Sequence, residues 1–438
     1  MKKKAATCKK RLHTPYKYDI RTSCLVVKRF NHRRRPLSAI LIKGEDMYAI
    51  VNAKQFKEAI KQIKALGGYA VQVKKDGEVL HMSSYQMPNN CYNSKGEPQY
   101  HPYGDLLLVD VKFKLEMPLQ NGNFKFVTTI DDLKAGGSCA DGGLLEISFE
   151  DDKAWCEGKY RQSLSLVDVS ASNFGFKEYE YDDLVVFDVP VDALQFTRPF
   201  TMCDDLDKRG FNNICIEEGG IVATDGHALG VKVWNMGDGC ELGYQVPIQN
   251  GVADAILASK ADTVTISAHI KQLEVLNPLN HEKELVKRFV GTYISSGDYS
   301  FLVKVENEFR FPDFKKVFPP KYDNQFLIDS DKWAAVISNL IKGFNYPVIT
   351  VTDEPGNFVF TVHEIRPKKG CVAIGDRQAK VERAAFNDYA WETFKCDAKI
   401  LLKTLKALDS AHTLIHIHNP DLIVLESWAG KAIVMQMQ

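Results

Sequence analysis

The sequence predicts an α+β protein made of three repeated modules, and three observations lead to this prediction. The chain has 438 residues, of which 45% are hydrophobic, and this length allows about two to four domains with real cores. Amphipathic helices expected to start near Asn52, Val191 and Asp329 lie 139 and 138 residues apart. Predicted strands outnumber predicted helices, which is typical of antiparallel sheets with helices on one face.

Each of these helices is predicted from hydrophobic spacing and from its first residue. The first is expected over Asn52–Leu66, where Asn52 is a suitable N-cap. Another is expected over Asp329–Leu340, and the Val191 region occupies the matching place between them. Apolar residues recur at helical spacing in the Asn52 and Asp329 helices: Phe56, Ala59, Ile60 and Ile63, and Trp333, Val336, Ile337 and Leu340.

A second unit alternates with the first and completes a two-unit module of about 130 residues, far longer than a solenoid repeat. Its helices are expected at Thr129–Leu133, Asn250–Ala258 and Asp397–Leu408. The strands expected after them are Leu144–Phe149, Ala154–Glu157 and Ser163–Val167; Thr263–Ser267 and Leu273–Leu276; and Thr413–Ile417, Leu422–Leu425 and Ala432–Met437. Three polar or charged stretches are predicted to be loops or insertions: His81–Asp105, Asn277–Gly297 and Arg366–Ala384.

The net charge of zero conceals a division of charge along the chain. Residues 1–46 hold 14 Lys and Arg against 3 Asp and Glu, so the rest of the chain is acidic. A basic extension on an acidic body indicates an anionic partner such as nucleic acid, although a solvated tail is the alternative. Leu37–Ile42 could form one strand within this extension.

Membrane and secreted classes of protein are disfavoured by the composition. No run of about 18 apolar residues exists to span a bilayer, and no apolar stretch follows the basic N-terminus as a secretory signal would require. The ten cysteines form no CxxC pair, so reduced thiols and a cytoplasmic location are expected.

Two predicted helices carry a stripe of lysines opposite their apolar face. Lysines fall at i, i+3, i+7 and i+10 in the first helix and at i, i+4 and i+7 in the last helix: Lys54, Lys57, Lys61 and Lys64, and Lys399, Lys403 and Lys406. A solvated helix face is the simpler explanation of one stripe, but matching stripes favour a surface that meets phosphates. No aromatic residue interleaves with them, which favours sequence-independent contact with duplex backbone.

Two local clusters could indicate catalysis or metal binding. Asp225-Gly226-His227 contains a potential acid and base, but Asp-Gly is also a common turn, and no nucleophile elbow or phosphate-binding loop accompanies it. His412, His416 and His418 could ligate a metal, although no acidic or cysteine ligand lies at a supporting spacing. We therefore expect no catalytic residue, metal or cofactor.

Three motifs, in this order, resemble the bacterial DNA polymerase III beta subunit, the sliding clamp. Thr224-Asp-Gly-His-Ala-Leu229 is similar to the TDGHRL turn of its middle domain, and Phe311-Pro-Asp-Phe-Lys-Lys-Val317 to its FPDYRRV segment. Val434-Met-Gln-Met437 is similar to its C-terminal VMPM. Ala228 and Gln436 depart from these motifs, which points to a divergent member that a phage could encode. The segment Arg161–Leu166 resembles the end of the family's first domain.

The resemblance implies three DNA-clamp domains per chain and a ring of two chains joined head to tail. The expected domains are 47–185, 186–321 and 322–438, after a basic extension over 1–46. Such a homodimer encircles duplex DNA in the cytoplasm, without catalysis or cofactor, and tethers DNA polymerase after a clamp loader has placed it. The runner-up is a monomeric clamp-fold adaptor that binds DNA without closing a ring, and an enzyme using Asp225 and His227 is the third hypothesis.

The resemblance also assigns residues to two kinds of site. The helices that line the hole would present their basic residues to DNA: Lys54, Lys57, Lys61, Lys64, Lys208, Arg209, Lys332, Lys399, Lys403 and Lys406. A partner peptide with apolar anchors would dock between the second and third domains: Phe211, Thr224, Gly226, His227, Leu229, Pro312, Lys316, Val317, Met435 and Met437. The alternative for Leu229 and Val317 is an ordinary place in the core.

Overall fold

The computed structural model describes most of the chain after residue 46. The described ranges are 47–68, 70–85, 106–116, 122–167, 180–202, 209–234, 242–276, 283–304, 311–318, 324–364, 375–382, 393–418 and 422–436. The chain divides into two compact units, Met1–Gly44 and Glu45–Gln438, and every described residue lies in the second. The basic extension and its predicted strand at Leu37–Ile42 are therefore outside the described residues.

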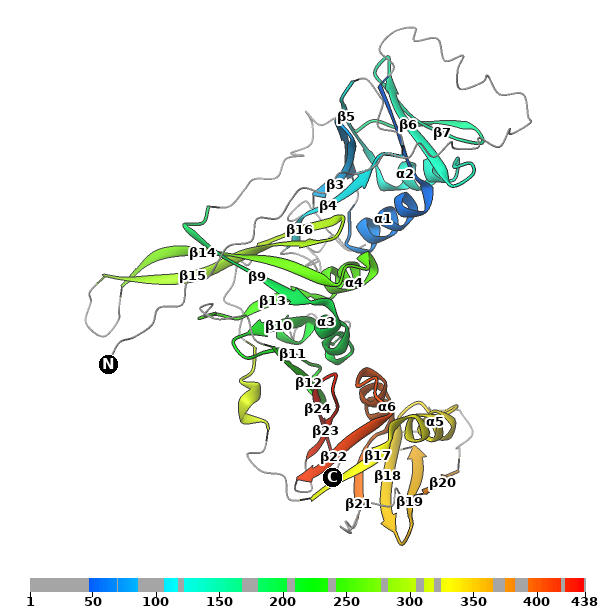
Figure 1. Ribbon diagram of the computed structural model, residues 1–438, viewed down its shortest axis with the longest axis vertical. Coiled ribbons are helices and arrows are strands. Elements are labelled where there is room, and N and C mark those ends of the chain that lie inside the picture. The colour runs from blue at the N-terminus through cyan, green and yellow to red at the C-terminus, as the bar shows by residue number, and fades with distance from the viewer. Residues whose placement is uncertain are drawn as a thin grey trace, which may run out of the picture. The chain divides into compact units, whose positions relative to one another are not determined.

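Six units, each with one strand, a helix and three further strands, follow one another along the described chain (Figure 1). The first two contain β1 (Met47–Asn52), α1 (Ala53–Ala65), β2 (Ala70–Asp76), β3 (Val79–Tyr85) and β4 (Leu106–Lys114), then β5 (Phe124–Thr129), α2 (Ile130–Gly137), β6 (Leu144–Glu150), β7 (Lys153–Glu157) and β8 (Arg161–Leu164).

The middle two units contain β9 (Asp183–Pro190), α3 (Val191–Thr197), the short 3-10 helices η2 (Arg198–Phe200) and η3 (Arg209–Asn212), β10 (Asn213–Glu217), β11 (Gly220–Thr224) and β12 (Ala228–Val233), then β13 (Val246–Gln249), α4 (Asn250–Ser259), β14 (Thr263–Leu276), β15 (Lys283–Ser296) and β16 (Tyr299–Lys304). The last two contain β17 (Asn324–Asp329), α5 (Ser330–Leu340), β18 (Pro347–Glu354), β19 (Asn357–Glu364) and β20 (Arg377–Glu382), then β21 (Thr393–Asp397), α6 (Ala398–Ala407), β22 (His412–His418), β23 (Leu422–Glu426) and β24 (Lys431–Met435). A third 3-10 helix, η4 (Phe314–Lys316), precedes β17.

The two units of each pair exchange their first strands. In the first pair β1 joins β6, β7 and β8, while β5 joins β2, β3 and β4. The middle and last pairs repeat the exchange, with β9 beside β14, β13 beside β10, β17 beside β22 and β21 beside β18. Each pair is therefore interlocked, because neither sheet can form without a strand from the other unit.

Adjacent pairs of units are joined by two strands: the last strand of the first unit in one pair and the last strand of the second unit in the next pair. β4 pairs with β16, and β12 pairs with β24, both antiparallel, so two eight-stranded sheets cross the junctions. The β12–β24 junction sets Leu229 opposite Ile433 and Gly230 opposite Ala432. The remaining two sheets have four strands each and end at β8 and at β20.

Side-chain caps explain where four of the helices begin. The residue that ends the preceding strand accepts a hydrogen bond from the new helix: Asn52 Oδ1 from the Lys54 N–H, Thr129 Oγ1 from Asp132, Asp329 Oδ1 from Lys332 and Asp397 Oδ1 from Lys399. These bonds satisfy amide groups that have no partner within the helix. The N-cap predicted at Asn52 is confirmed, with distances of 3.0 and 3.2 Å to the Lys54 and Gln55 nitrogens.

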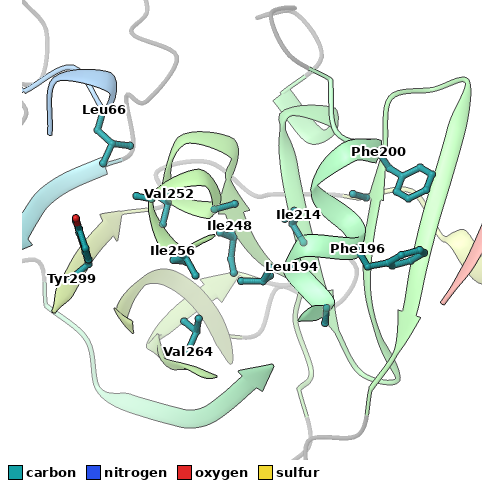
Figure 2. Packing of buried hydrophobic residues seen from close by; sticks show 14 of the residues in the cluster. Leu66, Leu194, Phe196, Phe200, Ile214, Ile248, Val252, Ile256, Val264 and Tyr299 are labelled. Carbon is teal, nitrogen blue, oxygen red and sulfur yellow. The ribbon is translucent and has the colours of Figure 1, made fainter. Parts of the chain in front are cut away.

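The core lies between the helices and the inner faces of the sheets. Figure 2 shows Leu194 of α3 and Ile256 of α4 with Ile248 of β13, and all three are buried. In the last pair of units Trp333 is packed against the rings of Phe358 and Phe360, with centroids 5.2 and 4.8 Å away. The apolar face predicted for the first helix is buried, since Phe56, Ala59, Ile60 and Ile63 all lie in this core.

Parts of the predicted loops are strands. Residues 283–296 of the stretch Asn277–Gly297 form β15, and residues 377–382 of Arg366–Ala384 form β20. The charged side chains in both are compatible with strands because residues 285–288 of β15 are exposed on both faces and every second residue of β20 is exposed. β14 is continuous over Thr263–Leu276, where two separate strands were predicted. β3 extends to Tyr85, inside the predicted loop His81–Asp105.

Candidate nucleic-acid interface and partner surface

The lysines of α1 form an exposed face opposite the core. Lys54, Lys57, Lys61 and Lys64 are all exposed. Lys61 Nζ lies 3.4 Å from Glu58 Oε1, and Lys64 Nζ lies 2.6 Å from Asp131 of α2. The Lys64 ammonium, by hydrogen bond and then by charge, lowers the pKa of the Asp131 carboxyl. Among the described residues Lys54 and Lys57 have no ion-pair partner, so they are the cations of this face that remain open to phosphate.

The lysines of α6 do not share one environment. Lys406 is exposed, and Lys399 is exposed with its Nζ donating to the Asn345 carbonyl oxygen at 2.7 Å. Lys403 is only partly exposed, and its Nζ lies 2.6 Å from Asp225 Oδ2. The predicted stripe is thus present on the helix, but one of its three members already has an anionic partner inside the protein.

The remaining predicted DNA residues contribute less. Lys332 at the start of α5 is exposed and forms an ion pair with Asp329 at 3.1 Å. Lys208, and the side chain of Arg209, lie outside the described residues. Neither α3 nor α4 contains a lysine or arginine, and nearby Arg198 forms two hydrogen bonds to Asp254 at 2.7 and 2.9 Å. Basic charge is therefore concentrated on the helices of the first and last pairs of units.

A tight turn between β11 and β12 holds the motif Thr224–Leu229. Thr224 Oγ1 donates to the Ala228 carbonyl at 2.7 Å and accepts from the Gly226 N–H at 3.1 Å. Asp225 Oδ1 accepts from the N–H groups of His227 and Ala228. Gly226 has a φ of 87°, which favours glycine, whereas a Cβ there would make only an ordinary contact of 3.5 Å with the Phe211 ring.

Three distant segments meet on one face of the second eight-stranded sheet. Leu229 of β12 and Ile433 of β24 belong to a single apolar cluster with Phe311 and Phe314. Phe314 lies in η4, so the 311–317 segment packs against this face through Phe311 and Phe314. The turn, this segment and the C-terminal strand are thereby assembled at the β12–β24 junction.

The predicted peptide-binding residues divide into buried and exposed sets. Leu229 and Thr224 are buried, which agrees with the alternative of a core position for Leu229. Val317 is 38% exposed and Met435 is 50% exposed, so both present apolar surface to solvent. Gly226, His227, Pro312 and Lys316 are exposed, Phe211 is half-buried, and Met437 lies outside the described residues. We call these ten positions the partner surface.

The corresponding face of the other junction is polar. Counted from the first residues of β3 and β11, His81 and Ser83 occupy the places of Val222 and Thr224, and Asp110, paired with Ser83, takes the place of Leu229. His81 Nδ1 lies 3.2 Å from Asp110 Oδ2, and Ser83 Oγ donates to Asp110 Oδ1 at 2.6 Å. An apolar peptide anchor would meet a hydrogen-bonded carboxylate at the first junction and apolar side chains at the second.

The residues considered for catalysis and metal binding are engaged in contacts that support the fold. Both Asp225 oxygens are engaged, one by the turn and one by Lys403. His416 is buried, and burial lowers the pKa of its imidazole, although the negative charge of Glu426 and a hydrogen bond to it oppose the shift. The described residues contain no group of three or more His, Cys, Asp or Glu side chains placed to hold a metal. In the same part of the chain, no helix has the length and hydrophobicity to cross a membrane.

Comparisons with known proteins bear on the fold. A scan of the sequence against family models found no match, and neither did a search of curated proteins. The structure matches the Caulobacter crescentus polymerase III beta protein with a TM-score of 0.62 and 16% identity, over 90% of this chain and 100% of the other. The Pseudomonas aeruginosa sliding clamp bound to griselimycin matches with a TM-score of 0.65 and 14% identity, over 90% and 100%. The polymerase III beta subunit of Borrelia burgdorferi gives 0.67 and 10%, over 90% and 98%.

This chain has the sliding-clamp fold. The α+β class and the repeated antiparallel architecture predicted from the sequence are confirmed. The identities of 10 to 16% agree with a divergent sequence, as the altered motifs indicate. The predicted domain limits stay predictions, and the limit between residues 185 and 186 falls inside β9.

Contacts in the structure add residues to this site that the sequence did not assign to it. The motifs at 224–229 and 311–317 were singled out, but their supports Phe314, Ile433 and Lys403 were not assigned to the same site. Phe314 and Ile433 join the cluster beneath the turn, and Lys403 joins the turn through Asp225. No sequence spacing links them, because Asp225 and Lys403 are 178 residues apart.

Proposed function

We propose that the protein is a DNA sliding clamp that closes as a head-to-tail homodimer around duplex DNA and tethers a DNA polymerase to it. The observation that carries the proposal is the pair of strands β8 and β20, which end the two four-stranded sheets and have no second neighbour among the described residues. β4 and β12 are the last strands of the first unit in their pairs, and β16 and β24 are the last strands of the second unit. Each junction therefore joins a first-unit strand to a second-unit strand.

The two unmatched strands belong to opposite classes. β20 is the last strand of a first unit, and β8 is the last strand of a second unit. A β20–β8 contact would repeat the rule of both existing junctions. Made between two chains, it would also bury two sheet edges that otherwise expose unpaired backbone groups. Two such contacts would close a symmetric ring of two chains, each of which contributes three pairs of units.

The register of this contact is transferred from the β12–β24 junction, since the β4–β16 junction is offset from it by one residue. Gln378 pairs with the fifth residue of β19, as Leu229 pairs with the fifth residue of β11. Ser163 pairs with Trp155, two residues before the end of β7, as Ile433 pairs with Val424, two residues before the end of β23. Because Leu229 lies opposite Ile433, Gln378 should lie opposite Ser163 of the second copy.

The proposed DNA contact rests on the exposed lysines of α1 and α6. Lys54, Lys57 and Lys406 are exposed and have no ion-pair partner in the described part of the chain. A clamp that slides needs contacts with phosphates that are weak and independent of sequence, which exposed lysines provide. Such a protein would act with a clamp loader and a DNA polymerase in the cytoplasm, without catalysing a reaction itself.

The proposed polymerase contact is the partner surface. Its exposed apolar members are Val317 and Met435, and Met435 bonds through its N–H to a turn whose backbone is held by Thr224 and Asp225. Methionine adapts to different apolar groups, which suits a surface that must receive both polymerase and loader. The exposed Lys316, which also pairs with Asp313 at 3.2 Å, would meet a polar or acidic group of the peptide.

A disulfide at the proposed ring contact tests the function directly. Ser163→Cys and Gln378→Cys in one chain should give a covalent dimer under oxidation, and each single variant controls for the native cysteines. When the double variant is oxidised in the presence of circular plasmid and then treated with SDS, part of it should stay with the plasmid. Cutting the plasmid once should release that part, because only a topological link is then lost.

A measurement of mass in solution would distinguish the ring from the alternative of a monomeric adaptor. A closed ring requires twice the chain mass of 49.4 kDa by light scattering at micromolar concentration. A mass of one chain, with no cross-link between Ser163→Cys and Gln378→Cys, would overturn the ring and favour the adaptor. A covalent dimer that leaves circular plasmid freely in SDS would show a dimer that does not encircle DNA.

A further inference from the structure

Asp225 connects the turn of the partner surface to helix α6. Its Oδ1 accepts hydrogen bonds from the His227 and Ala228 N–H groups at 2.9 and 2.8 Å. Its Oδ2 lies 2.6 Å from Lys403 Nζ. One carboxylate thus holds the turn with one oxygen and the last pair of units with the other.

This ion pair differs from the other lysine contacts on the basic helices. The Asp225 side chain is 14% exposed and the Lys403 side chain is 33% exposed. In the Lys64–Asp131 pair the Lys64 side chain is 49% exposed and the Asp131 side chain is 70% exposed. Salt and water screen an exposed pair strongly and a partly buried pair much less. A charge-assisted bond of 2.6 Å in this position is therefore a strong constraint on both side chains.

The last unit also holds the turn from its other side. The Met435 N–H of β24 donates to the His227 carbonyl oxygen at 3.0 Å. The turn is consequently fixed by α6 through Asp225 and by β24 through His227. Its conformation depends on two elements of the last unit, although its own residues belong to the middle pair of units.

We propose that Lys403 is a positioning residue for the partner surface, holding Asp225 so that the turn 224–229 keeps the shape that receives a partner peptide, and that it is not a DNA contact. This inference rests on the proposed function of the partner surface. It removes Lys403 from the predicted DNA stripe, because an ammonium already paired with a carboxylate releases few counterions when DNA arrives.

Loss of the ammonium would leave the Asp225 carboxylate largely buried without its cation. A carboxylate in that state tends to move toward water, because burial penalises its charge. Such a movement weakens the two bonds from Oδ1 to the turn. The first consequence should appear in peptide binding, since the N–H groups of His227 and Ala228 would no longer be held by Asp225.

Three variants and two measurements test the proposal. The probe is a fluorescein-labelled peptide with leucine and phenylalanine anchors, followed by anisotropy. Lys403→Met should weaken its binding about tenfold, or about 1.4 kcal/mol, and Lys403→Arg should restore most of the loss because it keeps the cation. Lys406→Met, on the same helix, should instead lower the salt dependence of binding to a short linear duplex by about 0.9. Lys403→Met should leave that salt dependence unchanged.

The outcomes separate this inference from the function on which it rests. If the wild-type chain fails to bind the peptide, the partner surface itself is wrong. If the wild type binds and Lys403→Met binds equally well, only the positioning role is wrong. A salt dependence lowered by Lys403→Met as much as by Lys406→Met would return Lys403 to the DNA contacts. Failure of Lys403→Arg to restore binding would mean that packing, and not charge, is responsible.

A second route covers a Lys403→Met chain that does not fold. Asp225→Asn keeps an oxygen that can accept from the turn but removes the charge that holds Lys403. It should weaken peptide binding by a similar factor, and the Asp225→Asn/Lys403→Met pair should lose little more than either variant alone. Additive losses in this cycle would overturn the coupling between the two residues.

Discussion

Leu229 of β12 lies directly opposite Ile433 of β24, so strands that are about two hundred residues apart in sequence are neighbours in one sheet. Both side chains enter the same apolar cluster, together with Phe314 of η4. This pairing joins the middle and last pairs of units and forms the floor of the partner surface. The junction and the positions of the partner surface therefore depend on the same strand pairing.

Gly230, next to Leu229, should tolerate no side chain. A Cβ there would lie 2.2 Å from the Phe200 ring, and overpacking of this kind costs about 1 to 3 kcal/mol. Gly230→Ala should therefore lower the free energy of unfolding by that amount in urea titrations. Gly243→Ala is the matched control, because nothing lies within 4 Å of its Cβ. Equal midpoints for the two variants would contradict the close contact with Phe200.

Trp333 should be the most sensitive position in the last pair of units. It is 1% exposed and packs edge-on against Phe358 and Phe360. Trp333→Ala should destabilise the protein by about 3 to 5 kcal/mol through the cavity that it leaves. Trp428→Ala, at a tryptophan that is 70% exposed, should cost far less. Comparable losses of thermal stability in both variants would show that Trp333 is not central to this core.

His416 should make stability depend on pH on the acid side of neutrality. Burial lowers the pKa of its imidazole in the folded protein below the ordinary value of 6.5. The unfolded chain then binds the proton more readily, so the contribution of His416 is fully present above pH 6.5 and is lost as pH falls through the folded pKa. His416→Leu should flatten this part of the urea stability profile. The exposed His412→Gln should keep the wild-type profile, and an identical profile for His416→Leu would refute the assignment.

Lys54 and Lys57 should each contribute to duplex binding through counterion release. Replacing either by glutamine should lower the slope of log affinity against log salt by about 0.9, equally for duplexes of different sequence. Lys283→Gln, in β15 away from the helices, should leave the slope unchanged. A loss that varied with DNA sequence would argue for base contacts and against the proposed sliding contact.

Val317 and Met435 should bind partner peptides without supporting the fold. Each exposes a large apolar fraction, so a change to serine should cost little stability but about 1 to 2 kcal/mol of peptide binding, roughly a factor of 5 to 30 in Kd. Leu285→Ser, at a leucine that is 70% exposed in β15, is the control. Substitution is preferable to deletion of Met435–Gln438, because Met435 also bonds the turn and Gln436 bridges Cys396. Unchanged affinity in the Val317→Ser/Met435→Ser double variant would remove both residues from the partner surface.

Local features of this fold could be predicted well from the sequence. The helices at Asn52, Asp329 and Asp397 were recognisable because an N-cap and the spacing of apolar residues act within a few neighbouring positions. The turn at Thr224–Leu229 was recognisable for the same reason, since glycine and the two side-chain acceptors lie within it. The strands in charged stretches were missed, most clearly β15, where residues 285–288 are exposed on both faces and the alternation that identifies a strand is absent.

The chain's local order of residues was enough to establish the helix starts, the repeat length, the basic helix faces and the motif-bearing turn, because each depends on residues close in sequence. The exchange of first strands between units, the β12–β24 junction and the Asp225–Lys403 pair depend on contacts across tens to hundreds of residues. Backbone hydrogen bonding and burial select among many possible pairings of similar strands, and composition does not distinguish them. Lys403 illustrates the difference: its spacing indicated a DNA contact, while its neighbours in space gave it a carboxylate partner.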